Sequence, residues 1–145
     1  MKDTNILLAG ATGYLGKYLL KELIDKKNQV IAIVRNPEKL QNSNEDYLEI
    51  KVAEVTKPET LRDICKGINT VISTVGITKQ KDGLTYMDVD YRANMNLLEE
   101  AKNSGVAQFV YVSAINGDKH RDLKIFEAKE QFVAALKSSG LNYTI

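Results

Sequence analysis

The chain has 145 residues, 43% of them apolar, which is enough for one layered core and too short for two ordinary domains. Its 20 basic and 19 acidic side chains nearly cancel, so its overall charge favours neither nucleic acid nor an anionic membrane as a partner. We therefore expect a single domain over residues 1–145 that binds a small molecule.

The first residues and the single cysteine bear on where the protein works. The apolar stretch after Asn5 is short and Gly10 interrupts it, so the sequence predicts neither a signal peptide nor a membrane span. Cys65 is the only cysteine, which excludes an internal disulfide and a multi-cysteine metal site and is typical of a reducing compartment. We expect a cytoplasmic protein without a bound metal, in which Cys65 is a small core residue.

Short apolar runs alternate along the chain with longer amphipathic stretches. The runs predict strands at residues 6–9, 30–34, 47–52, 70–74 and 109–113, and the start of a sixth at 141–145. The stretches between them predict helices at 13–26, 84–103 and 123–138, with short helices after Pro37 and Pro58. Nearly continuous apolar strands that alternate with helices indicate a parallel sheet covered on both faces, which is the doubly wound α/β architecture.

A glycine-rich turn, GATGYLG at residues 10–16, follows the first predicted strand and leads into the first helix. In such a turn the first glycine permits the tight bend, the second lets the backbone approach a pyrophosphate, and the third lets the helix pack on the strand. The free N–H groups of the helix and the positive end of its dipole then face the phosphates. The turn therefore predicts a dinucleotide site that includes Gly10, Thr12, Gly13, Tyr14, Leu15 and Gly16.

The end of the second predicted strand indicates which dinucleotide is bound. NAD-selective sites place an acidic residue there, about 20 positions beyond the glycines, to accept hydrogen bonds from the adenosine ribose. This chain has Val34, Arg35 and Asn36 instead. A guanidinium cannot accept those hydrogen bonds, but it pairs well with a phosphate on the ribose. The sequence therefore favours NADP over NAD, with Arg35 as the selective residue.

Taken together, these segments resemble the atypical, NmrA-like branch of the short-chain dehydrogenase/reductase superfamily over essentially the whole chain. The resemblance rests on the glycine turn, IAIVRNPEKL at 31–40, GINTVISTVG at 67–76, VDYRANMNLLEEAKNSGV at 89–106, FVYVSAI at 109–115 and SGLNYTI at 139–145. It implies a Rossmann-like sheet with strand order 3-2-1-4-5 and the start of strand 6. The cofactor would lie across the carboxyl ends of the strands.

The resemblance also implies contacts for particular residues. Glu54, which Val55 follows, stands where the family usually has an aspartate near the adenine. Thr74, Val75 and Gly76 stand where the family's fourth-strand loop passes the adenosine ribose. We therefore expect all five residues to bind the cofactor.

Of the catalytic residues that the resemblance implies near the nicotinamide, the acid–base tyrosine is missing. Ser113 matches the family's active-site serine, and Lys129 matches the lysine that contacts the nicotinamide ribose, so both are candidate catalytic and cofactor-binding residues. Dehydrogenases of this superfamily carry a tyrosine four residues before that lysine as the acid–base. Here the position is Ile125, which can neither donate nor accept a proton. Tyr111, Tyr91 and His120 could each supply the proton in place of the missing tyrosine, but we rank all three low.

Two functions stay open on this basis. An NADP-dependent oxidoreductase could act on a flavin- or quinone-like acceptor, which draws its proton from water and needs no tyrosine. A non-catalytic NADP-sensing or assembly module would bind the same cofactor without chemistry. A nucleotide-sugar epimerase ranks lower because it needs the missing tyrosine, and a DNA-binding protein ranks lower still because the net charge is near zero.

The substrate cannot be read from this sequence, because substrate specificity in this architecture comes from elements after the fifth strand. The sequence stops as the sixth predicted strand begins. We therefore expect the C-terminal substrate lobe of the family to be missing. We also expect the open side of the domain to permit self-association.

Overall fold

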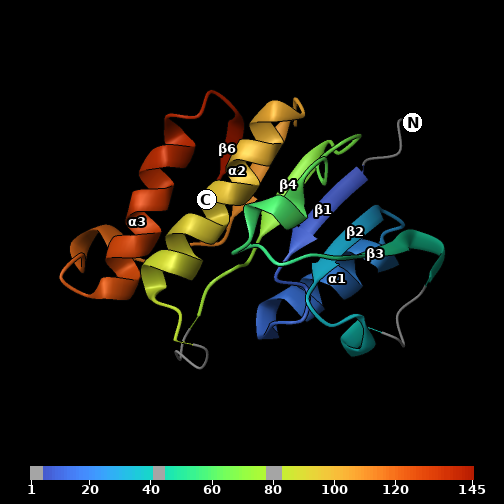
Figure 1. The fold of residues 1–145 in the computed structure, drawn as a ribbon, viewed down its shortest axis with the longest axis horizontal. Helices are drawn as coiled ribbons and strands as arrows, with labels where there is room; N and C mark the ends of the chain where they lie inside the picture. Colours follow the sequence, from blue (N-terminus) through green and yellow to red (C-terminus); the bar gives the residue numbers. More distant parts are fainter. Residues whose placement is uncertain (1–4, 41–44, 78–82) are drawn as a thin grey trace.

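The computed structural model describes residues 5–40, 45–77 and 83–145; residues 1–4, on which part of the signal-peptide expectation rests, lie outside this range. The described chain forms a six-stranded parallel sheet in the order β3-β2-β1-β4-β5-β6 (Figure 1). The strands are β1 Asn5–Ala9, β2 Gln29–Val34, β3 Leu48–Val52, β4 Thr70–Ser73, β5 Gln108–Tyr111 and β6 Asn142–Thr144. This order confirms the doubly wound, Rossmann-like prediction.

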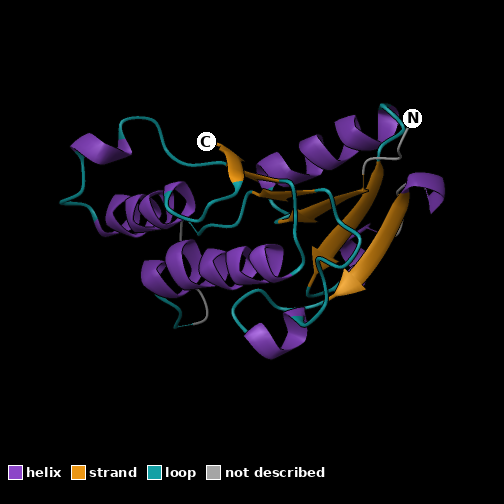
Figure 2. Ribbon diagram, turned by 90° about the horizontal axis from the view of Figure 1, so that it is seen from above, coloured by secondary structure: helices purple, strands orange, loops and turns teal. Residues whose placement is uncertain are grey.

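Helices cover the sheet in two layers, which Figure 2 separates in the view from above. On one face, α1 (Tyr14–Asp25) buries Leu20 and Ile24 against β1 and β2. On the other face lie α2 (Asn94–Asn103) and α3 (Lys124–Lys137). Their inward side chains pack on β1, β4 and β5, and include Leu97, Leu98, Ala101, Phe132 and Leu136. The two layers explain why the strands are apolar on both sides.

Some helical segments differ from the prediction in where they begin and in their type of helix. The predicted helix at 84–103 begins at Met87, and its first part, η4 (Met87–Ala93), is a π-helix that runs on into α2. The short helices predicted after the two prolines are single 3₁₀ turns, η1 (Pro37–Leu40) and η3 (Pro58–Leu61). Within the described residues, no helix has the length and apolar character needed to cross a bilayer.

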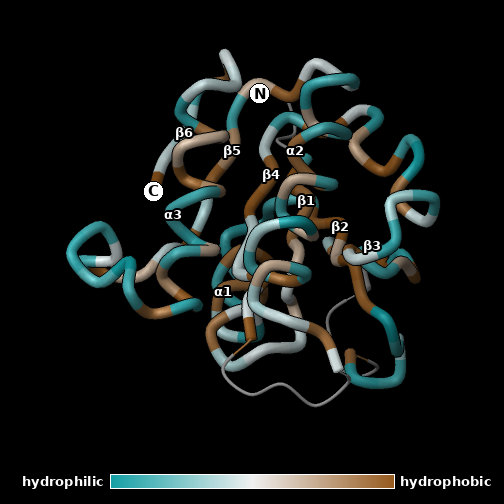
Figure 3. Tube along the Cα trace, turned by 60° about the vertical axis from the view of Figure 1, so that its left-hand side comes forward, coloured by the Kyte–Doolittle hydropathy of each residue, from teal (hydrophilic) through white to brown (hydrophobic). Residues whose placement is uncertain are grey.

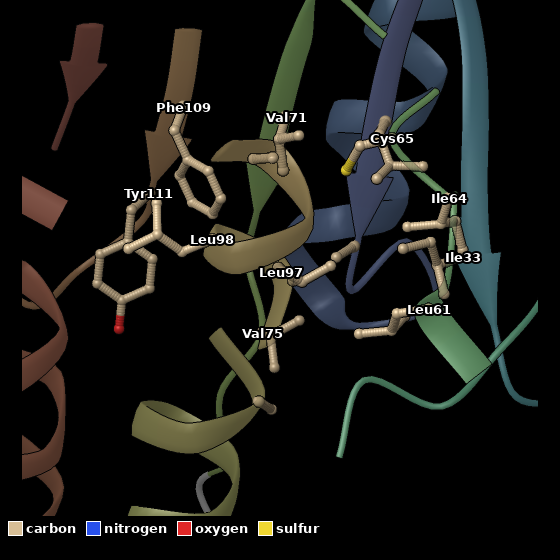
Figure 4. Close-up of a cluster of buried hydrophobic side chains, with 14 of the residues drawn as sticks. Ile33, Leu61, Ile64, Cys65, Val71, Val75, Leu97, Leu98, Phe109 and Tyr111 are labelled. Atoms are coloured by element: carbon tan, nitrogen blue, oxygen red, sulfur yellow. The ribbon is translucent and has the colours of Figure 1, made fainter. Parts of the chain in front are cut away.

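The larger core lies between the sheet and the α2–α3 layer, and apolar segments follow the central strands in Figure 3. The Phe132 ring lies 5.8 Å from the Phe109 ring and 4.6 Å from the Tyr111 ring, measured between centroids. Figure 4 shows Phe109 and Tyr111 beside Leu98 in this core, with Cys65 further along. These aromatic contacts join β5 to α3.

Cys65 is fully buried, which confirms its prediction as a core residue. Burial raises the pKa of its thiol to about 12. Because only the thiolate reacts, we expect the native protein to resist a thiol reagent such as dithionitrobenzoate at mildly alkaline pH. The urea-unfolded chain serves as the control and is expected to release one equivalent rapidly. Equally rapid labelling of the native protein would contradict the closed core.

Candidate functional site

A cavity of about 270 Å³ lies where β1, β2, β3 and β4 end. Nine of the predicted cofactor-binding residues line it: Gly10, Thr12, Gly13, Arg35, Glu54, Val55, Thr74, Val75 and Gly76. Its walls also contain residues that the sequence analysis did not single out: Ile33, Val34, Ala53, Thr56, Ile77, Leu84 and Val89. Six of these seven are apolar, and an apolar residue that lines a ligand cavity cannot be told from a core residue by its type alone.

Two glycines of the turn are required by close packing. Gly10 has φ +86°, and a Cβ there would overlap the Thr74 side chain. A Cβ on Gly16, which is buried, would overlap the carbonyl oxygen of Gly10. The Thr74 hydroxyl lies 3.2 Å from the carbonyl oxygens of Ala9 and of Gly10, to which it can donate. The fold itself therefore needs both glycines, where β1, β4 and α1 meet.

Gly13 differs from these two glycines. Its φ is −72°, and the one atom that an added Cβ would approach is the Gly10 carbonyl oxygen, at 3.4 Å, which is an ordinary contact. Gly13 is the N-cap of α1, and no side chain caps this helix. N–H groups at a helix start lack partners within the helix and attract anions. The packing of the chain gives no reason for a glycine here, and residue 13 lines the cavity.

The side chains of Tyr14 and Leu15 lie outside the cavity and are 80% and 48% exposed. The Tyr14 ring meets the Tyr18 ring edge-on, with 5.5 Å between centroids, and the Lys17 ammonium lies 5.7 Å from the Tyr14 centroid. Any contact of residues 14 and 15 with a ligand in the cavity would therefore come from their backbone N–H groups.

Arg35 and Glu54 place opposite charges in the cavity, just beyond β2 and β3. The Glu54 carboxylate pairs with Lys57 at 3.0 Å and accepts a hydrogen bond from the Thr56 hydroxyl at 3.0 Å. These two contacts, with a smaller effect of Arg35, hold the pKa of the Glu54 carboxyl below its usual value. This end of the cavity therefore offers a cation for a phosphate and a fixed carboxylate for a hydroxyl or amine.

A buried polar network supports the loop after β4. The Ser73 hydroxyl donates to the side-chain oxygen of Asn94 at 2.5 Å and accepts from the Val75 N–H at 3.2 Å. The Asn94 amide donates to the carbonyls of Val75 and Asp90, at 3.2 and 3.0 Å. The Ile77 N–H donates to Asp90 Oδ2 at 3.3 Å. Ser73, Asp90 and Asn94 are fully buried. The sequence analysis did not single out any of the three.

Lys129 lies against this network. Its Nζ is 2.9 Å from Asp90 Oδ1 and 5.6 Å from the centroid of the Tyr111 ring. A Cβ on Gly76 would come within 2.7 Å of Asp90 Oδ1 and 3.1 Å of Lys129 Nζ. Lys129 does not line the cavity, but its ammonium lies beside Gly76, which does.

Three buried side-chain atoms of the described residues have no hydrogen-bond partner: the hydroxyls of Tyr111 and Ser113, and Asp90 Oδ1, which contacts Lys129 as an ion pair. An unpaired buried polar atom costs about 1–3 kcal/mol, so each one requires an explanation, of which a bound polar group is one. Ser113 lies in the loop after β5, one strand beyond the loop that contacts Lys129. It does not line the cavity.

Comparison with known proteins identifies the family of this chain. Residues 10–145 match the model of a family described as NAD(P)H-binding. The chain belongs to this NAD(P)H-binding family. Membership confirms the resemblance to atypical, NmrA-like short-chain dehydrogenase/reductases and the prediction of a nicotinamide dinucleotide as the cofactor class.

Individual relatives match nearly the whole chain in sequence or in structure. The chain is 30% identical over 141 residues to the Photosystem II assembly factor Ycf39 of Cyanophora paradoxa, covering 97% of this chain and 44% of that protein. It is 32% identical over 163 aligned positions to the chloroplastic divinyl chlorophyllide a 8-vinyl-reductase of Cucumis sativus. This alignment covers 99% of the present chain and 38% of the reductase. An NADPH-dependent quinone oxidoreductase from Escherichia coli, solved with NADPH, superposes with a TM-score of 0.76 at 26% identity, covering 95% of this chain and 46% of that one. This NAD(P)H-binding chain thus spans less than half of each of these proteins.

At position 125, where the resemblance implied an acid–base tyrosine, the chain has Ile125, and none of the three candidate replacements lies at the cavity. Tyr111 is buried, and its burial, followed by the charge of Asp90, raises the pKa of its phenol, so it stays neutral. Tyr91 is half-buried against the core, and His120 is exposed beside the Phe126 ring. None of the three lines the cavity.

Proposed function

We propose that this protein binds NADP(H) and serves as an oxidoreductase domain that transfers a hydride to a small acceptor of flavin or quinone type. The observation that carries the cofactor part is Gly13. Its backbone would accommodate a side chain, yet residue 13 is a glycine at an uncapped helix start inside the cavity. A pyrophosphate on the N–H groups of α1 would use both the open helix end and the missing Cβ.

The choice of NADP(H) over NAD(H) rests on Arg35. Arg35 follows β2 and lines the cavity, so its guanidinium would stand where NAD-selective sites have a carboxylate. The neighbouring Glu54 stays ionised and would accept hydrogen bonds from the adenine or its ribose. A phosphate on the ribose would then be held by Arg35 and oriented away from Glu54, since like charges repel.

The reactive end would be held by groups beyond β4 and β5. NADPH, when bound, supplies a hydride to an oxidised acceptor. The Lys129 ammonium, held by Asp90 beside Gly76, would bind the hydroxyls of the nicotinamide ribose, and the unpaired Ser113 hydroxyl would orient a polar group of the acceptor. No ionisable side chain occupies position 125, so the acceptor would take its proton from water. Flavins and quinones are acceptors of this kind, and the Escherichia coli relative is a quinone oxidoreductase.

Rapid mixing of NADPH-loaded protein with menadione or flavin mononucleotide tests the catalytic part. We expect the NADPH absorbance to decay faster than in a protein-free control. The exposed-lysine variant Lys124→Met is expected to match the wild type, whereas Lys129→Met is expected to be slower by about tenfold or more. Decay at the background rate with every acceptor would remove the catalytic part of the proposal.

A second candidate is a non-catalytic NADP-sensing or assembly module. Ile125 favours it, and one relative is an assembly factor. For such a module, NADPH would raise the unfolding temperature by mass action while no acceptor produced turnover. The acceptor experiment and a thermal shift measured on the same sample therefore separate the two functions.

A further inference from the structure

Asp90 and Lys129 form an ion pair unlike those on the surface. The Asp90 side chain is fully buried and the Lys129 side chain is 13% exposed. In the surface pair Lys21–Asp25, the two side chains are 74% and 55% exposed. Burying an ion pair is often no better for stability than packing apolar residues of the same volume. Stability alone therefore gives no reason to keep charges at these two positions.

The buried pair connects the helix layer to the wall of the cavity. Asp90 uses one oxygen for Lys129 and the other for the N–H of Ile77, at 3.3 Å. The pair also fills the space beside Gly76, because a Cβ there would lie 2.7 Å from Asp90 Oδ1 and 3.1 Å from Lys129 Nζ. Gly76 and Ile77 both line the cavity. One carboxylate therefore fixes the lysine and the loop relative to each other.

The π-helix η4 presents the Asp90 carboxylate at this place. η4 packs against α3, which carries Lys129. The amide of Asn94, the residue after η4, donates to the Asp90 carbonyl at 3.0 Å and to the Val75 carbonyl at 3.2 Å. π-helical turns are rare and occur frequently at functional sites. Asp90 is thus held through its backbone, and its carboxylate is left for Lys129 and the loop.

We propose that Asp90 is a positioning residue for the nicotinamide half of the cofactor: it holds the Lys129 ammonium against Gly76, where the lysine binds the nicotinamide ribose. This inference rests on the proposed binding of NADP(H). The sheet order places Arg35 and Glu54 on one side of β1 and the loops after β4 and β5 on the other. Asp90 therefore acts through Lys129 on the nicotinamide half, while Arg35 and Glu54, on the other side of β1, would hold the adenosine ribose and its phosphate.

The test compares two ligands by isothermal titration calorimetry. One is NADPH, and the other is adenosine 2′,5′-bisphosphate, which carries the ribose phosphate but no nicotinamide. Asp90→Asn is expected to weaken NADPH binding about tenfold, as the loss of a charged partner typically does. The affinity for the bisphosphate is expected to stay within about twofold, since distant sites behave independently. Asp25→Asn, which removes the exposed carboxylate of a surface pair, serves as the matched control and is expected to change neither affinity.

A double-variant cycle shows whether Asp90 acts through Lys129. In a Lys129→Met background, Asp90→Asn is expected to cause no further loss of NADPH affinity. Equal weakening of both ligands, or the same loss in both backgrounds, would show a merely structural role and overturn the inference.

Two further outcomes are distinguishable. If Asp90→Asn does not fold, Asp90→Glu keeps the charge but displaces it by one methylene, and it is expected to show the same ligand-selective loss. If the wild type itself does not bind NADPH, the proposed cofactor is wrong and the role of Asp90 falls with it.

Discussion

Gly13→Ser is expected to leave the free energy of unfolding unchanged or to raise it by a few tenths of a kcal/mol, while it weakens NADPH binding by at least about tenfold. Serine is a preferred N-cap residue, Gly13 has the extended backbone of an N-cap, and its Cβ would meet no close contact. The side chain would instead occupy the place that the pyrophosphate needs. Urea denaturation and calorimetric titration measure the two effects on one preparation.

Gly16→Ala provides the opposite control within the same turn. Its Cβ would overlap the Gly10 carbonyl oxygen, so we expect it to lower the free energy of unfolding by about 2–3 kcal/mol. NADPH binding would then fail because the turn is deformed. Wild-type NADPH affinity in a stable Gly13→Ser protein would contradict the phosphate role of residue 13, and wild-type stability of Gly16→Ala would contradict the packing role of residue 16.

Arg35→Asp is expected to reverse the choice of cofactor. Loss of a charge-assisted contact typically corresponds to 1.5–3 kcal/mol, so NADPH affinity is expected to fall by about 10- to 100-fold. NADH affinity is expected to stay the same or to rise, because the new carboxylate can accept hydrogen bonds from the ribose hydroxyls. Parallel titrations of the two cofactors at one salt concentration measure the ratio.

Lys39→Asp is the matched control for this charge reversal. Lys39 is exposed on η1, close along the chain to Arg35, and it does not line the cavity. It is expected to leave the NADPH-to-NADH ratio unchanged, since it alters the net charge without altering the site. Equal affinity of the wild type for the two cofactors would defeat the assignment of Arg35.

The parallel, doubly wound sheet was predictable because the fold repeats one local rule, whereas the strand order was implied only by the family resemblance. Apolar runs separated by amphipathic stretches require parallel strands with crossover helices, and the crossovers have one preferred hand. The ends of the elements were less predictable. Thr74 and Ser113 were placed in strands, but β4 ends at Ser73 and β5 at Tyr111. A strand ends where its hydrogen bonds to the neighbouring strand end, and the types of residue in the strand do not reveal that position.

The helix at 84–103 shows a different limit. Its first turns are π-helical, and the Asn94 amide, at the end of these turns, donates to the carbonyls of Asp90 and Val75. A signal was present in the sequence: Asp90 and Asn94 are four residues apart, in register with Leu98 on the buried stripe. Polar residues on a buried stripe need partners. Those partners, Ser73 and Lys129, are distant in the sequence, so they could not be named from the helix alone.

By itself, the sequence determined the layered α/β fold, the helix start at the glycine turn and the positive charge after β2, because each is encoded by residues close together in the chain. The glycine pattern assigned roles to Gly10, Gly13 and Gly16, but only the tertiary structure decided which atoms an added Cβ would meet: Thr74 at Gly10, the Gly10 carbonyl oxygen at Gly16 and no close contact at Gly13. It also decided that Lys129 meets a buried carboxylate beside the cavity loop. That contact joins η4, α3 and the end of β4, and it exists only when the two helices pack against the same sheet.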